Sequence, residues 1–237
     1  MNESDPPATI ADSDSPAGTL SPDRLRDRIE RGETVTILDV RIASDFETWH
    51  IEGGSVEITN RPYYAFLEDE RDAIEQVPAG DPVIVVCAEG DASEYVAGLL
   101  VDAGRQAVSL ENGMEGWASI YDGTEITAYD GPGTVIQYHR PSTGCLSYLV
   151  ASKGETAVID PLRSFAERYR EDVAGLGATL EYAIDTHCHA DHVSGVGSLT
   201  EHGVDGLVPA ATIDRGMEIT AEFSQLEDGD VLEVGAI

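Results

Sequence analysis

Residues 186–192 read Thr-His-Cys-His-Ala-Asp-His, the densest group of metal-binding side chains in the sequence. Alternating apolar residues before this motif predict a strand that ends at Asp185, and apolar residues at helical spacing after it predict a helix that stops at Gly203. The motif therefore occupies a strand-to-helix loop. The fold must then place the end of a strand and the first turn of a helix around one cavity.

The loop contains four candidate metal ligands. His187 and His189 would direct two imidazoles at one point, and Asp191 and His192 would face the same cavity from the opening turn of the helix. Such a mixture of nitrogen and oxygen donors suits zinc or iron. The alternative is a polar loop whose imidazoles are satisfied by hydrogen bonds. The complete pattern, placed after a strand and before a helix, favours the metal site.

The first half of the chain carries an independent pattern. Residues 34–41 and 82–87 are short apolar runs rich in β-branched side chains, which predicts strands buried on both faces of a parallel sheet. A serine cap followed by proline predicts a helix over residues 21–32, and apolar spacing predicts another over residues 93–100. This alternation of strands and helices predicts an α/β architecture.

Cys87 lies at the carboxyl end of one predicted strand, just before a helix. The backbone N–H groups of a tight loop and the positive end of the following helix would stabilise a thiolate at this position. The alternative is a small core residue, because free cysteines are often simply buried. Position alone leaves both interpretations open.

From about residue 20 to residue 122 the chain resembles the rhodanese family. The resemblance rests, in order, on Asp-Val-Arg at 39–41, Asp-Phe at 45–46, His-Ile-Glu-Gly-Gly at 50–54, the loop that starts with Cys87, and Leu-Glu-Asn-Gly-Met-Glu-Gly-Trp at 110–117. It implies that Cys87 carries a persulfide sulfur as the catalytic residue, that Asp39 and Arg41 hold the structure, and that Gly113 and Gly116 shape a turn.

Two departures from the rhodanese pattern concern the substrate. Thiosulfate-using rhodaneses usually place a basic residue late in the cysteine loop, whereas this loop has Ala92 there and adds Glu89 and Asp91. The motif that follows His50 is also one residue longer than usual. Whether this acidic loop accepts thiosulfate therefore stays open.

Residues 182–195 resemble the metal loop of the metallo-β-lactamase superfamily, and specifically its persulfide dioxygenase branch. Residues 142–150 and 157–161 are similar to the opening strand pair of that family, so the resemblance extends from about residue 135 to the end. It implies an αββα domain with iron(II), held by His187 together with a later histidine and aspartate. Hydrolytic relatives of the glyoxalase II type recruit all four loop residues around two metals, which makes zinc the alternative cofactor.

No histidine follows His202, and the sequence stops at residues 230–237 in what reads as a strand. We therefore expect residues 134–237 to be an incomplete, truncated metallo-β-lactamase-like domain. It would belong to a longer enzyme, to a split enzyme with a separately encoded C-terminal half, or to a remnant. On this expectation the chain alone binds metal weakly and turns nothing over at the metal.

The chain has 45 acidic residues, 14 basic residues and a formal net charge of −31, and Lys153 is its one lysine. Such a surface repels itself unless salt screens it, which predicts a halophilic protein and excludes nucleic acid and anionic membranes as partners.

Residues 1–19 predict a disordered acidic tail, and residues 123–133, rich in glycine, predict a linker between the domains.

The sequence contains no apolar run long enough to span a membrane and no signal peptide. Its three cysteines are widely separated and suggest no disulfide framework. We therefore expect a cytoplasmic protein. We expect packing roles for Cys145 and Cys188. We expect structural roles for His50, His139 and His202.

Three classes of function remain. The first is sulfur metabolism, in which Cys87 transfers sulfur and an iron site oxidises a small persulfide or a related thiol compound. If both sites share one chain, the effective concentration of their common sulfur intermediate rises. The second is a glyoxalase II-like thioester hydrolase, in which a metal lowers the pKa of bound water. The third is a non-enzymatic sulfur carrier or remnant.

Overall fold

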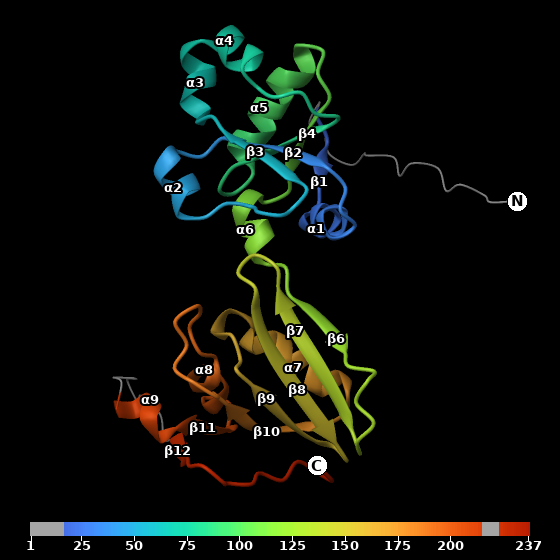
Figure 1. Ribbon diagram of the computed structural model, residues 1–237, viewed down its shortest axis with the longest axis vertical. Coiled ribbons are helices and arrows are strands. Elements are labelled where there is room, and N and C mark those ends of the chain that lie inside the picture. Colours follow the sequence, from blue (N-terminus) through green and yellow to red (C-terminus); the bar gives the residue numbers. More distant parts are fainter. Residues whose placement is uncertain (1–16, 215–222) are drawn as a thin grey trace, which may run out of the picture. The chain divides into compact units, whose positions relative to one another are not determined.

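The computed structural model describes residues 17–214 and 223–237. Contacts divide the chain between Ile120 and Tyr121 into two units, and each is considered by itself (Figure 1). Within the described residues, no helix combines the length and the apolar character that crossing a membrane requires.

The first unit is a five-stranded parallel sheet in the order β1-β5-β4-β2-β3. Its strands are β1 (Thr19–Leu20), β2 (Val35–Asp39), β3 (Val56–Asn60), β4 (Val83–Val86) and β5 (Ala107–Leu110). Its helices are α1 (Pro22–Glu30), α2 (Ala43–Thr48), α3 (Tyr63–Glu68), α4 (Glu70–Glu75), α5 (Asp91–Asp102) and α6 (Gly113–Ala118).

Every residue of β2 and β4 is buried, as expected for central strands covered on both faces. One cluster of apolar side chains joins the sheet to α3, α4 and α5, and another joins it to α1 and α6. α1 begins at Pro22, where the Ser21 hydroxyl accepts a hydrogen bond from the Arg24 N–H at 3.4 Å. These features confirm the predicted α/β fold and its helix start.

The second unit contains a seven-stranded mixed sheet in the order β12-β11-β10-β9-β8-β7-β6. Its strands are β6 (Asp122–Glu125), β7 (Thr134–Arg140), β8 (Cys145–Ser152), β9 (Glu155–Ile159), β10 (Thr179–Ile184), β11 (Asp205–Pro209) and β12 (Phe223–Leu226). Its helical segments are η1 (Arg163–Phe165), α7 (Ala166–Gly175), α8 (Val196–Thr200) and α9 (Ala210–Asp214).

The sheet of the second unit is antiparallel from β6 to β9 and parallel from β9 to β12. Side chains of α7 and α8 pack with the sheet in one apolar cluster. On β8, Leu149 belongs to that cluster, whereas Leu146 on the opposite face is exposed. The parallel half directs the carboxyl ends of β9, β10 and β11 to one edge, where the metal-binding motif begins.

Three sequence predictions about chain organisation need correction. Part of the predicted linker forms β6, which pairs with β7 from Asp122 to Glu125. The predicted C-terminal strand is wrong, because Val234 and Ile237 exchange two backbone hydrogen bonds of 3.0 Å in a turn and Gly235 has a φ of 62°. Residues 1–16 of the predicted tail lie outside the described residues, but Thr19 pairs with Ser109 in the first sheet.

Candidate functional site

Cys87 directly follows β4 and lies at the carboxyl end of that strand. Its Sγ accepts a hydrogen bond from the Gly90 N–H at 3.0 Å and lies 3.3 Å from the Ser93 hydroxyl. The side chain is buried, and the loop leads directly into the 12-residue helix α5. A backbone donor and the start of a helix therefore face the sulfur, as in loops that bind anions.

Close approach of α6 fixes the loop that carries this thiol. Gly113 has a φ of 52°, and a Cβ built there would lie 2.3 Å from the Cys87 carbonyl oxygen. The same approach lets the Met114 N–H donate to that oxygen at 2.8 Å and the Glu115 N–H donate to the Ala88 carbonyl at 3.0 Å. Only glycine meets both requirements at residue 113.

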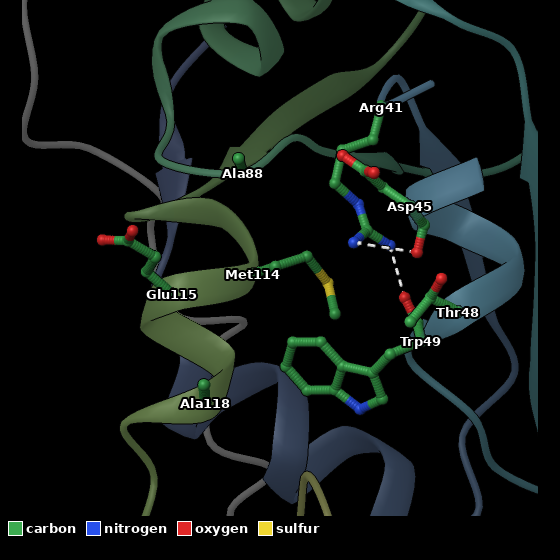
Figure 2. A pocket seen from close by; sticks show the side chains of 8 residues that line it. All are labelled: Arg41, Asp45, Thr48, Trp49, Ala88, Met114, Glu115 and Ala118. Carbon is green, nitrogen blue, oxygen red and sulfur yellow. Dashed lines mark hydrogen bonds between the residues drawn. The ribbon is translucent and has the colours of Figure 1, made fainter. Parts of the chain in front are cut away.

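A cavity of about 350 Å³ lies beside the thiol loop and is lined by Ala88 (Figure 2). The side chains of Trp49 and Met114 point toward each other in it. The charge of Arg41 is already paired, since its Nη2 lies 2.6 Å from Asp39 Oδ2 and 2.7 Å from the Trp49 carbonyl. The other charged lining residues are acidic, namely Asp45 and Glu115.

The three histidines of residues 186–192 gather between β10 and α8. The ring centroids of His187 and His189 are 4.2 Å apart, and those of His189 and His192 are 4.1 Å apart. The structure therefore brings the three predicted imidazole ligands together. His187 is exposed, whereas the side chains of His189 and His192 are only 3% and 5% exposed.

Asp160, at the end of β9, anchors this loop. Its carboxylate accepts hydrogen bonds from the N–H and the hydroxyl of Thr186, both at 2.7 Å. His189 Nε2 lies 3.2 Å from both the Asp160 and the Asp185 carboxylates. Burial raises the pKa of Asp185 above its usual value. Two carboxylates facing Nε2 place the ring proton there and leave a lone pair on Nδ1.

The remaining nitrogens of the two buried rings support metal binding. His189 Nδ1 and His192 Nε2 are buried and have no hydrogen-bond partner among the described residues. In His192 the other nitrogen, Nδ1, lies 3.2 Å from Asp191 Oδ2. A buried polar atom left without a partner costs about 1–3 kcal/mol, and metal coordination would satisfy each lone pair. The donor set therefore fits a metal.

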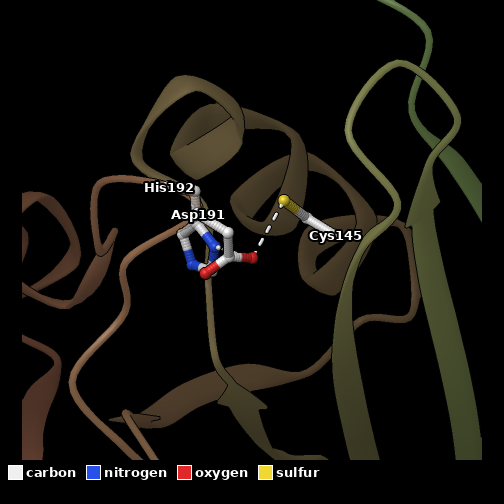
Figure 3. Close-up of side chains that lie close together, drawn as sticks. All are labelled: Cys145, Asp191 and His192. Carbon is white, nitrogen blue, oxygen red and sulfur yellow. Dashed lines mark hydrogen bonds and ion pairs between the residues drawn. The ribbon is translucent and has the colours of Figure 1, made fainter.

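Cys145, at the start of β8, lies against the same loop (Figure 3). Its Sγ donates to Asp191 Oδ2 at 3.2 Å and accepts a hydrogen bond from the Thr143 hydroxyl at 2.9 Å. The hydrogen bond from Cys145, assisted by His192, lowers the pKa of Asp191 to about 2, and burial raises the pKa of the Cys145 thiol. The prediction of a packing role alone for Cys145 is therefore incomplete.

Among residues 17–214 and 223–237, the possible ligands form two groups of three, each with donor atoms within 4.8 Å of one another. One group is Asp160, His187 and His189, and the other is Cys145, Asp191 and His192. Asp160 and Cys145 were not predicted as part of the site.

Cys188 is exposed, so its predicted packing role is wrong. His50 has a structural environment, because its ring stacks on Phe46 at 4.3 Å.

Two family models match the chain. The rhodanese-like domain matches residues 21–120, and the metallo-beta-lactamase superfamily matches residues 140–230. The thiosulfate sulfurtransferase GlpE of Tolumonas auensis is 32% identical over 89 residues, which are 37% of this chain and 76% of that protein. The chain belongs to the rhodanese family. A metallo-β-lactamase domain follows this rhodanese domain, which confirms the predicted order of folds.

Two further relatives are similar to part of this rhodanese-family chain. The persulfide dioxygenase ETHE1 of Bos taurus is 32% identical over 120 residues, which are 48% of this chain and 45% of that protein. A hydroxyacylglutathione hydrolase of a Synechococcus strain is 38% identical over 77 residues, which are 32% of this chain and 29% of that protein. The chain thus spans less than half the length of these two relatives, and the family match indicates a metal cofactor.

Proposed function

We propose that the rhodanese domain transfers sulfane sulfur through Cys87 and that the metallo-β-lactamase domain takes part in iron-dependent oxidation of a persulfide. The observation that carries this proposal is the setting of Cys87, whose Sγ accepts the Gly90 N–H at 3.0 Å at the start of α5. Similarity to a thiosulfate sulfurtransferase and to a persulfide dioxygenase supports sulfur metabolism as the common theme.

In the transfer step, the Cys87 thiolate attacks the terminal sulfur of a persulfide, R–S–SH. The S–S bond of the donor breaks, and R–S⁻ leaves and takes up a proton from solvent. A new S–S bond joins Cys87 to the transferred sulfur. The Gly90 N–H, which donates to Sγ at 3.0 Å, would then stabilise the charge on the cysteine persulfide, while the Ser93 hydroxyl donates its proton to the Gly90 carbonyl.

The charge around the loop favours a donor that carries little negative charge next to the sulfur it transfers. Glu89 and Asp91 are exposed beside the cysteine, and Ala92 stands where a cation would assist thiosulfate. At about 6 Å, two like charges repel by about 0.7 kcal/mol in water and by about 3 kcal/mol at an effective dielectric near 20. We therefore propose an organic persulfide, rather than the thiosulfate dianion, as the sulfur donor.

Charge-neutralising variants test this preference. Glu89→Gln with Asp91→Asn should raise the rate with thiosulfate while the rate with glutathione persulfide changes less. Glu57→Gln is a matched control, because Glu57 is an exposed acid on β3 outside the cysteine loop. Equal effects of the double variant on both donors would contradict the electrostatic argument.

In the metallo-β-lactamase domain, His187 and His189 would hold the iron, and Asp160 would keep their loop in place through Thr186. The bound iron supplies the activation of dioxygen. The overall reaction is R–SSH + O₂ + H₂O → R–SH + SO₃²⁻ + 2H⁺. His189 is prepared for binding because its Nε2 faces two carboxylates and its Nδ1 lone pair has no other partner among the described residues.

Sulfite formation tests the dioxygenase part of the proposal. If the domain acts as proposed, and not as the inactive domain expected from the sequence, protein loaded anaerobically with iron(II) and then supplied with glutathione persulfide and oxygen should form sulfite. His187→Ala should abolish this activity, whereas the matched variant His202→Ala should not, because His202 is exposed and outside both ligand groups. Sulfite formation that persists in His187→Ala would contradict the proposed role of His187.

A thioester hydrolase is the second candidate. Similarity to a hydroxyacylglutathione hydrolase and the presence of two ligand groups favour it. Zinc in the purified protein, together with hydrolysis of a glutathione thioester and no sulfite formation, would establish this alternative. Iron with sulfite formation would support the leading proposal. If neither reaction occurs while Cys87 still takes up sulfur, the protein is a sulfur carrier.

A further inference from the structure

The cavity beside the thiol loop is lined by the backbone neighbours of Cys87 (Figure 2). Its lining includes Ala88, the residue that follows the thiol, and Met114, whose N–H donates to the Cys87 carbonyl oxygen at 2.8 Å. Its volume of about 350 Å³ lies at the lower end of the range that small-molecule sites occupy. A small molecule in this cavity would therefore lie next to the thiol loop.

The middle of the cavity is apolar. The indole of Trp49 and the thioether of Met114 point toward each other in it, and α6 adds the small side chain of Ala118. Such side chains would contact a short hydrocarbon chain. The face of an indole ring carries partial negative charge, so Trp49 also offers a favourable contact to a cation.

The charges around the cavity also favour a cation. The Arg41 side chain is only 9% exposed, and its Nη2 lies 2.6 Å from the carboxylate of the fully buried Asp39, so these two charges neutralise each other. The other two charged lining residues, Asp45 and Glu115, are exposed acids. An ammonium group in the cavity would be attracted by these carboxylates, whereas a carboxylate group would be repelled.

We propose that this cavity binds the organic group of the sulfur donor, and that the donor is the persulfide of a small aminothiol. The inference rests on the proposed transfer of sulfur through Cys87. The hydrocarbon chain of the donor packs between Trp49 and Met114, and its ammonium group faces the acids at the rim. The S–S bond of the donor breaks as the outer sulfur bonds to the Cys87 thiolate, and the aminothiol leaves and takes up a proton from solvent.

Two donors of similar length test the charge preference. Cysteamine persulfide carries an ammonium group, and 3-mercaptopropionate persulfide carries a carboxylate in its place. Mass spectrometry would follow the uptake of sulfur by Cys87 from each donor at the same salt concentration. We expect the second-order rate constant to be at least about fivefold larger for cysteamine persulfide. Equal rate constants for the two donors would overturn the proposal.

Variants of the rim acids show whether the preference arises in the cavity. Asp45→Asn with Glu115→Gln should reduce the preference for cysteamine persulfide at least about twofold. Glu47→Gln with Glu57→Gln is the matched control, because both are exposed acids of the same unit outside the cavity lining. An equal reduction in the two double variants would overturn the proposal, since the preference would then come from the general acidity of the surface.

A steric variant tests the place of binding independently of charge. Ala118→Leu enlarges a side chain of the cavity wall and should lower the rate constant with cysteamine persulfide about tenfold or more. Hydrogen disulfide, HS–S⁻, has no organic group and should load Cys87 of this variant at the unmutated rate. An equal loss with both donors, or no loss with cysteamine persulfide, would overturn the proposal.

The same measurements separate this proposal from the function on which it rests. If the unmutated chain takes up sulfur on Cys87 from hydrogen disulfide but does not distinguish the two organic donors, only the cavity proposal is overturned. If Cys87 takes up sulfur from none of the three donors, transfer through Cys87 is contradicted, and the cavity proposal is overturned with it.

Discussion

The Asp160 carboxylate links the end of β9 to Thr186, immediately before the first histidine of the metal loop. Asp160 has a φ of 51°, a conformation that few residues other than glycine, asparagine and aspartate adopt readily. Its carboxylate also lies 3.2 Å from His189 Nε2. One residue therefore fixes both the backbone of the loop and the orientation of an imidazole.

Asp160→Asn should weaken metal binding about 10- to 100-fold while the protein remains folded, because asparagine accepts the left-handed backbone but offers one acceptor oxygen instead of two. Competition between the protein and a chromogenic chelator for zinc would measure the change. Asp205→Asn is the control, since Asp205 is exposed on β11 outside the ligand groups. Equal affinity in the two variants would contradict the anchoring role of Asp160.

Gly113 and Gly104 offer a matched pair for the thiol loop. Both have positive φ, 52° and 79°, but only at Gly113 would a Cβ collide with the Cys87 carbonyl. Gly104→Ala should cost about 1–3 kcal/mol of stability through backbone strain alone. Gly113→Ala should cost more, because the collision adds to the strain. Both tryptophans lie in the first unit, so urea unfolding followed by tryptophan fluorescence reports on it.

At the scale of elements, a network of buried hydroxyl groups joins β8 to α7 and the start of η1. Tyr121, Ser147 and Tyr169 are mutually hydrogen-bonded, and the Leu162 N–H donates to the Tyr169 hydroxyl at 3.0 Å. Burial raises the pKa of Tyr121 and of Tyr169 above the usual tyrosine value. The folded state therefore holds these protons more tightly than the unfolded chain does.

This linkage predicts alkaline lability of the second unit. Above about pH 10 the unfolded tyrosines ionise while the folded ones stay protonated, so the free energy of unfolding should fall as pH rises. Tyr121→Phe should lower stability at neutral pH but make the decline between about pH 9 and 11 shallower. Thermal unfolding over this pH range would measure the decline in stability. Tyr64→Phe is the control, because Tyr64 is exposed. An unchanged slope in Tyr121→Phe would show that its burial does not cause the decline.

Local patterns predicted the elements that local chemistry determines. β2, β4 and α1 follow from β-branched runs and a Ser-Pro start, and the structure has them within about two residues of the predicted bounds. β6 was missed because Asp-Gly-Thr-Glu carries no apolar pattern and is a strand only through its pairing with β7. A segment with this composition gives no signal until its partner strand is known.

The same distinction applies to the candidate metal site. The four loop residues could be predicted because they lie within six positions of one another, from His187 to His192. Asp160 and Cys145 could not, because the tertiary fold brings them from 26 and 46 positions away to Thr186 and Asp191. Sequence spacing identifies donors that share a loop, whereas donors from other strands require the sheet order.

At the scale of the whole molecule, the net charge of −31 predicts that folding depends on salt. The Debye length shrinks from about 30 Å at 0.01 M to about 3 Å at 1 M salt, so repulsion among carboxylates is screened only at high ionic strength. Thermal unfolding midpoints should therefore rise from dilute to multimolar potassium chloride. A midpoint that stays constant over this range would show that the acidity is not an adaptation to salt.

Sulfur mapping on the intact chain most directly tests the claim that Cys87 carries sulfane sulfur. The protein would be incubated with glutathione persulfide in molar potassium chloride, and peptides heavier by one sulfur atom would be located by mass spectrometry. We expect the added sulfur on Cys87 in the unmutated chain and in Cys145→Ser and Cys188→Ser, and its loss in Cys87→Ser. Added sulfur that persists in Cys87→Ser, or that is found only on Cys145 and Cys188, would contradict the proposed function.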